Sequence, residues 1–202
     1  MGGRVTAAIG LGSNVGDPEA ALTAAVAALG ALPEARVVAV SPLYATAPVG
    51  VADQAEFRNA VAVLDVPAGP DPETGAVALL VALKGIERAF GRRDRGRWGP
   101  REIDLDLLLF GDAAIRVDRP EAGRSVDPEK APRLLEVPHA LARKRLFVLA
   151  PLADVLPDAM PSGWDETVAE ARDRVAAAEP PGAARAVGAW DPTARAWRGP
   201  SD

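Results

Sequence analysis

The sequence predicts an α+β fold in which helices cover a mainly antiparallel sheet. Three observations lead to this expectation. Short β-branched and apolar runs alternate with two segments whose apolar residues recur at helical spacing. Two of the strand-like runs meet at a tight turn, Gly111-Asp112, which is typical of an antiparallel hairpin. With 202 residues, 49% of them hydrophobic, the chain is long enough to bury one core of ordinary size.

The first half of the chain is predicted to form three strands and two helices. The strands are expected at residues 4–9, 36–44 and 57–66, and the helices at residues 18–32 and 74–90. Asp17 before Pro18 signals the start of the first helix, and Gly91 ends the second. Between the first strand and the first helix, the run GLGSNVGD predicts a turn.

The second half of the chain is less regular. We expect a strand at residues 103–110, with residues 113–117 as its hairpin partner. Residues 118–133 are polar and contain prolines, so they are predicted to be an exposed insertion. The apolar run RLFVLAPLADV, residues 145–155, predicts a strand or a turn, and residues 165–178 predict a short amphipathic helix.

The C-terminal end has low sequence complexity apart from Trp190 and Trp197. Both tryptophans lie in a segment that contains prolines and glycines, so their docking on the core is a hypothesis. We therefore expect one main domain over residues 1–162. Residues 163–202 are expected to form a C-terminal helix and a low-complexity tail, not a separate domain.

The composition argues against several classes of protein. The chain has no cysteine, which excludes disulfides and thiolate metal sites. No run resembles a secretory leader or a membrane span, so we expect a cytoplasmic protein that binds no membrane. A net charge of −5 argues against a nucleic-acid partner, which would require a basic surface. We expect a monomer that acts on small molecules.

Two aspartates interrupt one of the most apolar runs of the chain, RWGPREIDLDLLLFG. Alternation along a strand predicts one face with Asp104, Asp106, Leu108 and Phe110, and another with Ile103, Leu105, Leu107 and Leu109. The two carboxylates then lie roughly 6.5 to 7 Å apart at their Cα atoms. Like charges at this spacing favour a hard divalent cation between them. Alternatively, the strand begins at a solvated edge and both aspartates face water.

An arginine- and glycine-rich loop precedes these aspartates. It contains Arg92, Arg93, Arg95, Arg97 and Arg101 among Gly91, Gly96 and Gly99. Guanidinium groups opposite two carboxylates suit a polyphosphate, because metals bridge its oxygens and arginines bind the remaining charge. The other interpretation is a structural, solvated arginine loop.

His139 is the only histidine, which disfavours a serine-histidine triad and a multi-histidine metal site. It is followed by Arg143, Lys144 and Arg145. This segment is either a second phosphate-binding cluster or a solvated basic turn.

Five stretches in the same order resemble 6-hydroxymethyl-7,8-dihydropterin pyrophosphokinase, an enzyme family of folate biosynthesis. They are GLGSN, SPLYATAPVG, DQAEFRNAV, RWGPREIDLDLL and VPHALARKRLFVLAPL, and the resemblance covers about residues 4–160. It implies a ferredoxin-like fold and a magnesium-dependent ATP:hydroxymethyldihydropterin diphosphotransferase. Such an enzyme transfers the β,γ-pyrophosphoryl group of ATP to the hydroxymethyl oxygen of the pterin and releases AMP.

The resemblance also implies roles for individual residues. Asp104 and Asp106 would hold two Mg²⁺ ions, and Arg92 and Arg101 would join them as catalytic residues. The implied ATP contacts are Glu87, Trp98, Arg101, Leu107, His139 and Arg145, with Arg92 and Trp98 on a lid loop. Lys84 and Ala140 depart from the side chains that many members carry at these positions.

The implied pterin contacts are Thr46, Val49, Phe57, Asn59, Trp98 and Phe147. Two aromatic faces and a few fixed polar groups suit a flat heterocycle. The alternative for Phe57 and Phe147 is that both are simply core residues.

Three rival functions stay open at this point. A nucleic-acid-binding module would need aromatics and a basic face, whereas only 4% of the residues are aromatic. A non-catalytic regulator with the same fold would not need the paired aspartates. A nucleotide-sugar transferase uses a similar Asp-x-Asp motif but normally needs a larger nucleotide-binding domain.

Overall fold

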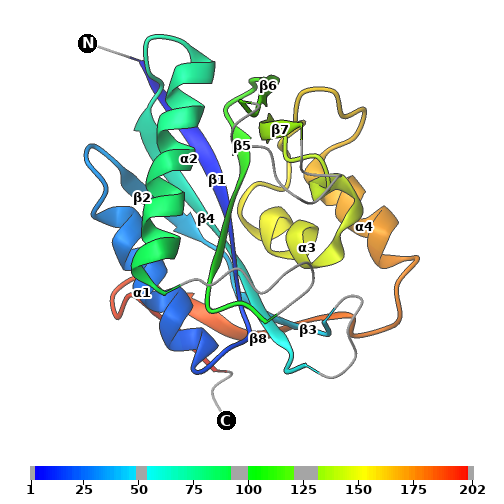
Figure 1. Cartoon of the computed structure of the whole chain (residues 1–202). Helices are drawn as coiled ribbons and strands as arrows, with labels where there is room; N and C mark the ends of the chain where they lie inside the picture. Colours follow the sequence, from blue (N-terminus) through cyan, green and yellow to red (C-terminus); the bar gives the residue numbers. More distant parts are fainter. Residues whose placement is uncertain (1–2, 49–53, 92–99, 121–131, 200–202) are drawn as a thin grey trace.

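The computed structural model describes residues 3–48, 54–91, 100–120 and 132–199. Figure 1 shows a central sheet between two pairs of helices. The helices are α1 (Pro18–Gly30), α2 (Pro72–Ala89), α3 (Leu146–Val155) and α4 (Val168–Ala176). Among the described residues, no helix has the length and hydrophobicity needed to cross a membrane.

The sheet is antiparallel and follows a β-α-β-β-α-β order. Five of its seven described strands form this order: β1 (Arg4–Ser13), β2 (Arg36–Val40), β3 (Leu43–Thr46), β4 (Phe57–Pro67) and β5 (Asp104–Phe110). Strands β2 and β3 together take the place of one strand in it. In space β5 pairs with β1, β1 pairs with β4, and β2 and β3 both pair with β4. This is the connectivity of a ferredoxin-like fold. The predicted α+β class with a mainly antiparallel sheet is confirmed.

Two of the predicted elements in the first half need correction. The run GLGS is not a turn, because β1 continues to Ser13, pairing with β4 up to Ser13 and with β5 up to Gly12. The predicted strand 36–44 is divided at Ser41-Pro42 into β2 and β3. At the break, the Ser41 hydroxyl accepts a 2.9 Å hydrogen bond from the backbone N–H of Val61.

Helix α1 begins at Pro18, as the Asp17 signal predicts, whereas α2 begins at Pro72, two residues before its predicted start at residue 74. The Asp17 side chain accepts from the N–H of Ala20, and the Asp71 side chain accepts from the N–H of Thr74. Both helices bury leucines and alanines against one face of the sheet. This first core includes Ile9, Leu22, Leu29, Leu64, Leu83 and Leu105.

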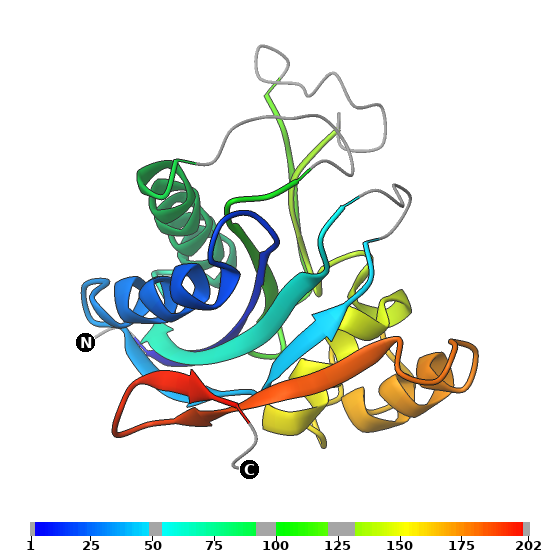
Figure 2. The same cartoon turned by 90° about the horizontal axis from the view of Figure 1, so that it is seen from below.

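Helices α3 and α4 cover the opposite face, as Figure 2 shows from below. The prediction of a strand or turn at 145–155 is wrong, since these residues form α3. A short apolar run lacks the periodicity that distinguishes a buried strand from a buried helix. Leu149 and Leu152 are fully buried in this second core. Helix α4 begins with a capping box between Thr167 and Glu170, inside the predicted range.

Strand β5 contains a β-bulge that the sequence pattern does not reveal. Ala8 pairs with Leu109 and Ile9 pairs with Leu107, so Leu108 is the extra residue. The alternation predicted for 103–110 therefore holds only up to Leu108. Beyond it, Leu109 joins Leu108 in the second core, and Phe110 joins the first core.

The predicted hairpin between 103–110 and 113–117 is also wrong. Strand β6 (Ile115–Asp118) pairs with β7 (Arg133–Val137) in a separate two-stranded sheet. The chain between them coincides with most of the predicted insertion at 118–133. Its two ends, Asp118 and Arg133, are paired strand residues, and residues 121–131 lie outside the described part.

The C-terminal end forms a hairpin instead of a low-complexity tail. Strands β8 (Ala184–Asp191) and β9 (Ala196–Arg198) pair with each other, and β8 also pairs with β3. Figure 2 shows this hairpin along one margin of the sheet. Trp197 is buried in the first core and meets Trp190 edge to face, with ring centroids 4.8 Å apart. The hypothesis that the tryptophans dock on the core is confirmed, while the domain division at residue 162 stays a prediction.

Candidate active site

Asp104 and Asp106 lie on β5 opposite two glycines of β1. Asp104 pairs with Gly12 and Asp106 pairs with Gly10, so the carboxylates and the glycines share one face of the sheet. Both aspartates are half-buried. A Cβ atom on Gly12 would lie 3.2 Å from Asn59 Oδ1 and 4.0 Å from the Asp104 Cβ. Glycine at position 12 therefore lets the Asn59 amide lie close to the backbone of β1 beside Asp104.

Two carboxylates are suited to magnesium that also binds a phosphate substrate. They are less suited to a metal whose ligands all come from the protein. Magnesium in phosphate-transfer sites uses one or two carboxylates and takes its other ligands from water and phosphate oxygens. Within residues 3–48, 54–91, 100–120 and 132–199, no three acidic or histidine side chains gather into a metal site. Two carboxylates on one face of a strand are compatible with an ion that arrives with its substrate.

The bulge of β5 fixes the segment that carries His139. The backbone N–H of His139 donates a 2.9 Å hydrogen bond to the carbonyl oxygen of Leu108, the bulged residue. The Nδ1 atom of His139 accepts from the N–H of Leu141 at 3.4 Å. Since Leu108 follows Asp106 by two residues, the bulge ties the histidine segment to the strand of the aspartates.

Arg145 stands at the start of α3, directly after the 3₁₀ turn Ala142–Lys144. Its guanidinium carbon lies 5.5 Å from the centroid of the Phe147 ring. Both residues belong to the helix pair that covers the face of Asp104 and Asp106.

The end of the GLGSN motif positions Arg101. The Oδ1 atom of Asn14 accepts from the N–H of Arg101 at 2.8 Å, and the N–H of Asn14 donates to the Arg101 carbonyl at 3.0 Å. The Ser13 hydroxyl donates to the Glu102 carbonyl at 2.8 Å. The Nδ2 atom of Asn14 also donates to the carbonyl of Ala55 at 3.2 Å. Sequence reasoning missed Ser13 and Asn14, although two polar residues at the end of an apolar run were a usable signal.

Four of the predicted pterin-binding residues lie on the side of the sheet that α3 and α4 cover. Asn59 Nδ2 donates a 2.8 Å hydrogen bond to Thr46 Oγ1, and both residues are buried. Phe57 alternates with Asn59 on β4 and is half-buried, as is Phe147 on α3. Neither phenylalanine belongs to the two buried cores, so the alternative that they are simply core residues is wrong.

Tyr44 connects this face to α3. Its hydroxyl donates a 2.6 Å hydrogen bond to Asp154 Oδ2. Burial raises the pKa of Tyr44 above its ordinary value, and the hydrogen bond to Asp154 adds to the effect. The neutral phenol therefore holds β3 against the helix.

Comparison with known proteins decides the family. The family model described as 7,8-dihydro-6-hydroxymethylpterin-pyrophosphokinase (HPPK) matches residues 8–157. The chain belongs to this family. A 2-amino-4-hydroxy-6-hydroxymethyldihydropteridine pyrophosphokinase of Pseudomonas aeruginosa is 44% identical over 150 residues, which are 74% of this chain and 80% of that protein. The protein of the same name from Methylorubrum extorquens is 41% identical over 163 residues, 81% and 89% of the two chains.

Solved structures agree with the HPPK family at the level of the fold. The structure of wild-type Plasmodium falciparum HPPK-DHPS aligns with a TM-score of 0.64 at 15% identity, over 86% of this chain and 45% of that one. The wild-type protein with pteroate aligns with a TM-score of 0.63 at 16% identity, over 86% and 43%. The chain thus spans less than half the length of these solved chains. The shared fold is the ferredoxin-like one.

Two of the nucleotide contacts predicted from the HPPK resemblance lie on the α2 side of the sheet. Leu107 is buried in the first core, on the opposite face from Asp104 and Asp106. Glu87 is 2% exposed, and its Oε1 atom accepts a 2.7 Å hydrogen bond from the backbone N–H of Leu105. A direct nucleotide contact of either residue stays a prediction.

Three other residues of the predicted HPPK site lie outside the described residues. They are Val49, Arg92 and Trp98.

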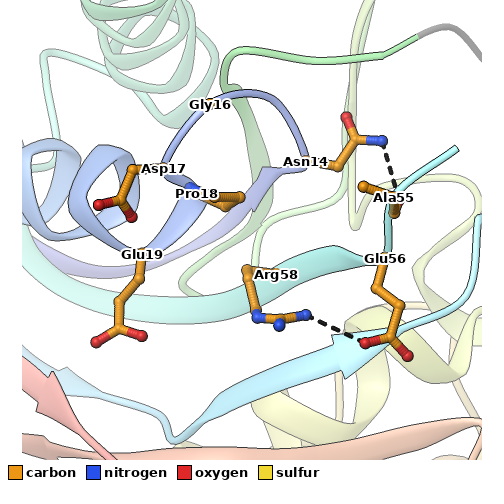
Figure 3. Close-up of a pocket in the computed structure, with 8 residues that line it drawn as sticks. All are labelled: Asn14, Gly16, Asp17, Pro18, Glu19, Ala55, Glu56 and Arg58. Atoms are coloured by element: carbon orange, nitrogen blue, oxygen red, sulfur yellow. Dashed lines mark hydrogen bonds and ion pairs between the residues drawn. The ribbon is translucent and has the colours of Figure 1, made fainter.

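An open hollow near the start of α1 does not coincide with the predicted HPPK site. Figure 3 shows its lining, and its volume is about 400 Å³. The residues that line it are Asn14, Gly16, Asp17, Pro18, Glu19, Ala55, Glu56 and Arg58. Arg58 alternates with Phe57 and Asn59 on β4, so it points to the α1 side of the sheet. Asn14, which lines the hollow, also contacts the backbone of Arg101.

Proposed function

We propose that this protein transfers the pyrophosphoryl group of ATP to the hydroxymethyl group of 6-hydroxymethyl-7,8-dihydropterin, in folate biosynthesis. Its products are AMP and the pterin diphosphate. Membership of the HPPK family supports this reaction. The observation that carries it in the structure is the placement of Asp104, Asp106, Thr46, Phe57 and Asn59 on one face of the sheet.

Magnesium is the proposed cofactor, as two ions held by Asp104 and Asp106. When bound there, the ions would supply positive charge that neutralises the triphosphate and orients the attacking hydroxyl. The placement of both half-buried carboxylates on one face of β5 supports this assignment, because magnesium can bind one or two carboxylates and take its other ligands from phosphate. Both the identity of the metal and the number of two ions are proposed here.

The chain itself supplies positioning and further positive charge. Arg101 and Arg145 bind phosphate oxygens in the proposal, and His139 donates a hydrogen bond to them. Arg101 is suited to this role because Asn14 holds its backbone at two points. Positioning of this kind provides most of the rate in phosphoryl-type transfer.

The pterin is proposed to bind between Phe57 and Phe147, with its polar edge against Thr46 and Asn59. The half-buried state of both rings supports this, because a ring that stacks on a ligand needs one free face. The Thr46–Asn59 hydrogen bond fixes the amide for recognition of the pterin edge.

Several further assignments come from the resemblance alone. Arg92 is proposed as a catalytic residue, Trp98 as a contact of both substrates, and Val49 as a backbone contact of the pterin. Glu87 and Leu107 are proposed near the nucleoside. We also propose a cytoplasmic monomer without nucleic-acid or membrane partners.

Product analysis tests the proposed reaction. The purified protein is incubated with ATP, magnesium and 6-hydroxymethyl-7,8-dihydropterin, and the nucleotides are separated by chromatography. We expect AMP and the pterin diphosphate in equal amounts, and no AMP when the pterin is omitted. Formation of ADP or free phosphate instead would overturn the proposal.

A further inference from the structure

The strand that carries Asp104 and Asp106 is held from its outer side by two residues of α2. Among the described strands, β5 is at the edge of the sheet, and one side of its backbone pairs with none of them. There Glu87 Oε1 accepts from the Leu105 N–H at 2.7 Å, and Lys84 Nζ donates to the Leu105 carbonyl at 3.0 Å. Lys84 Nζ also donates to Glu87 Oε1 at 2.8 Å. We call these three contacts the Leu105 bracket.

The Leu105 bracket acts on both peptide planes that join the two aspartates. The N–H of Leu105 belongs to the peptide unit that begins at Asp104, and the carbonyl of Leu105 belongs to the unit that ends at Asp106. Because a peptide unit is planar, one hydrogen bond to each restricts the rotation of both units about the Leu105 Cα. The bracket thereby restricts how the two carboxylates stand relative to each other.

The charges and burial of the Leu105 bracket favour a firm attachment. The Glu87 side chain is only 3% exposed, and Lys84 neutralises it at close range. Hydrogen bonds to a charged group are stronger than those between neutral groups. At the same time, the side chain of Leu105 is fully buried in the first core, so the residue is fixed through both its backbone and its side chain.

We propose that Lys84 and Glu87 are positioning residues, which hold the metal-binding carboxylates at the spacing that the substrate-bound metal requires. The inference rests on the proposed function, since it takes Asp104 and Asp106 as metal ligands. It assigns Glu87 a role through Leu105 that does not depend on a contact with the nucleotide. Removal of such a support typically weakens metal binding by about tenfold to a hundredfold.

Four variants test the Leu105 bracket. Glu87→Leu removes the acceptor, Lys84→Met removes the ammonium but keeps the aliphatic chain, and Glu87→Gln keeps an oxygen for the Leu105 N–H. The control is Arg88→Gln, at an exposed position of the same helical turn. For each variant, Mn²⁺ affinity is measured by electron paramagnetic resonance in the presence of a saturating, non-hydrolysable ATP analogue. Hydrogen exchange of the Leu105 amide is measured by NMR.

We expect Glu87→Leu to speed exchange at Leu105 and to weaken Mn²⁺ binding by about tenfold or more. Lys84→Met should weaken Mn²⁺ binding less. The Mn²⁺ affinities of Glu87→Gln and Arg88→Gln should stay close to that of the unchanged protein. Binding of the ATP analogue without metal should change less than Mn²⁺ binding does, since the Leu105 bracket acts on the two carboxylates.

Two results would overturn the inference. If exchange at Leu105 rises but Mn²⁺ affinity does not change, the Leu105 bracket only protects the edge of the sheet. If Glu87→Leu weakens binding of the ATP analogue without metal as much as it weakens Mn²⁺ binding in the presence of the analogue, Glu87 acts as a nucleotide ligand instead. Failure of the proposed function would look different, because the unchanged protein would then release no AMP from ATP and the pterin.

Discussion

The indole N–H of Trp197 donates a 2.9 Å hydrogen bond to the carbonyl oxygen of Ser41, and both residues are buried. Ser41 stands at the junction of β2 and β3, and Trp197 lies on the last strand of the chain. The contact therefore joins the C-terminal hairpin to the strand that carries Thr46. The family match ends at residue 157, so this hairpin lies outside the matched region.

The first prediction concerns the stability that this contact provides. Trp197→Phe should lower the free energy of unfolding by about 1–3 kcal/mol, because a buried carbonyl loses its donor. Trp197→Ala should cost about 3–5 kcal/mol, since it also empties space in the core. Urea denaturation followed by circular dichroism measures both. Trp190→Phe is the control. If Trp190→Phe and Trp197→Phe lowered the free energy of unfolding equally, this would contradict a specific role of the Ser41 contact.

The second prediction concerns the paired aspartates. Asp104→Asn and Asp106→Asn keep the shape of the side chain but remove the charge that holds a cation. Each should lower the rate of AMP formation by about a hundredfold or more, the scale seen when a charge-stabilising group is lost. Thermal unfolding should change little.

Asp112→Asn is the matched control, because Asp112 is an exposed carboxylate just beyond the same strand. Its rate should equal that of the unchanged protein. A near-normal rate for Asp106→Asn at saturating magnesium would refute the metal assignment.

The third prediction separates the pterin from the nucleotide. Thr46→Val keeps the side-chain volume but removes the oxygen that accepts from Asn59 Nδ2. If the bond orients Asn59, its loss should cost about 1.4 kcal/mol of pterin binding, which is a tenfold rise in Kd. Calorimetric titration measures pterin and ATP analogue separately, and the analogue should bind unchanged. Thr46→Ser should restore pterin affinity, and equal weakening of both ligands would argue for general disruption.

Sequence patterns predicted the parts of the fold that depend on local signals. Helix α1 begins after Asp17 as predicted, because a capping side chain and a following proline act within a few residues. The same signal at Asp71 and Pro72 starts α2, but the predicted start at residue 74 missed it. The shared face of Asp104 and Asp106 followed from strand alternation alone. The prediction for the α3 segment was wrong because an apolar run has no polar residues whose spacing would distinguish a helix from a strand.

Other features depend on partners far away in the sequence. The bulge at Leu108 arises from the pairing of β5 with β1. Strand β8 forms because its backbone pairs with the edge of β3. The role of Asn14 depends on a distant partner in the same way, because its side chain holds the backbone of Arg101, 87 residues further along the chain. Contacts of this kind follow from tertiary pairing and not from the composition of either segment.

The last prediction concerns the stability of the protein at low pH. It depends on the contacts of Glu166 with α4 and with the 3₁₀ turn Ala142–Lys144. Glu166 accepts from Arg174 at 2.7 and 3.0 Å and from Arg143 at 2.7 Å. The Arg174 and Arg143 guanidinium groups lower the pKa of Glu166 from its ordinary 4.5 to about 2. A carboxylate with a lowered folded-state pKa stabilises the fold above its unfolded pKa, and this contribution is lost as pH falls. Glu166 should therefore stabilise the protein fully above about pH 4.5 and progressively less toward pH 2.

Glu166→Gln tests this pH dependence. The variant should unfold at a lower temperature than the unchanged protein at pH 7, and the difference should shrink as pH falls from about 4.5 toward about 2. Calorimetric melting across this range measures it, with Glu179→Gln as a control that removes one carboxylate from an exposed position. A difference that stays constant down to the lowest pH would mean that Glu166 stabilises the junction by its packing and not by its charge.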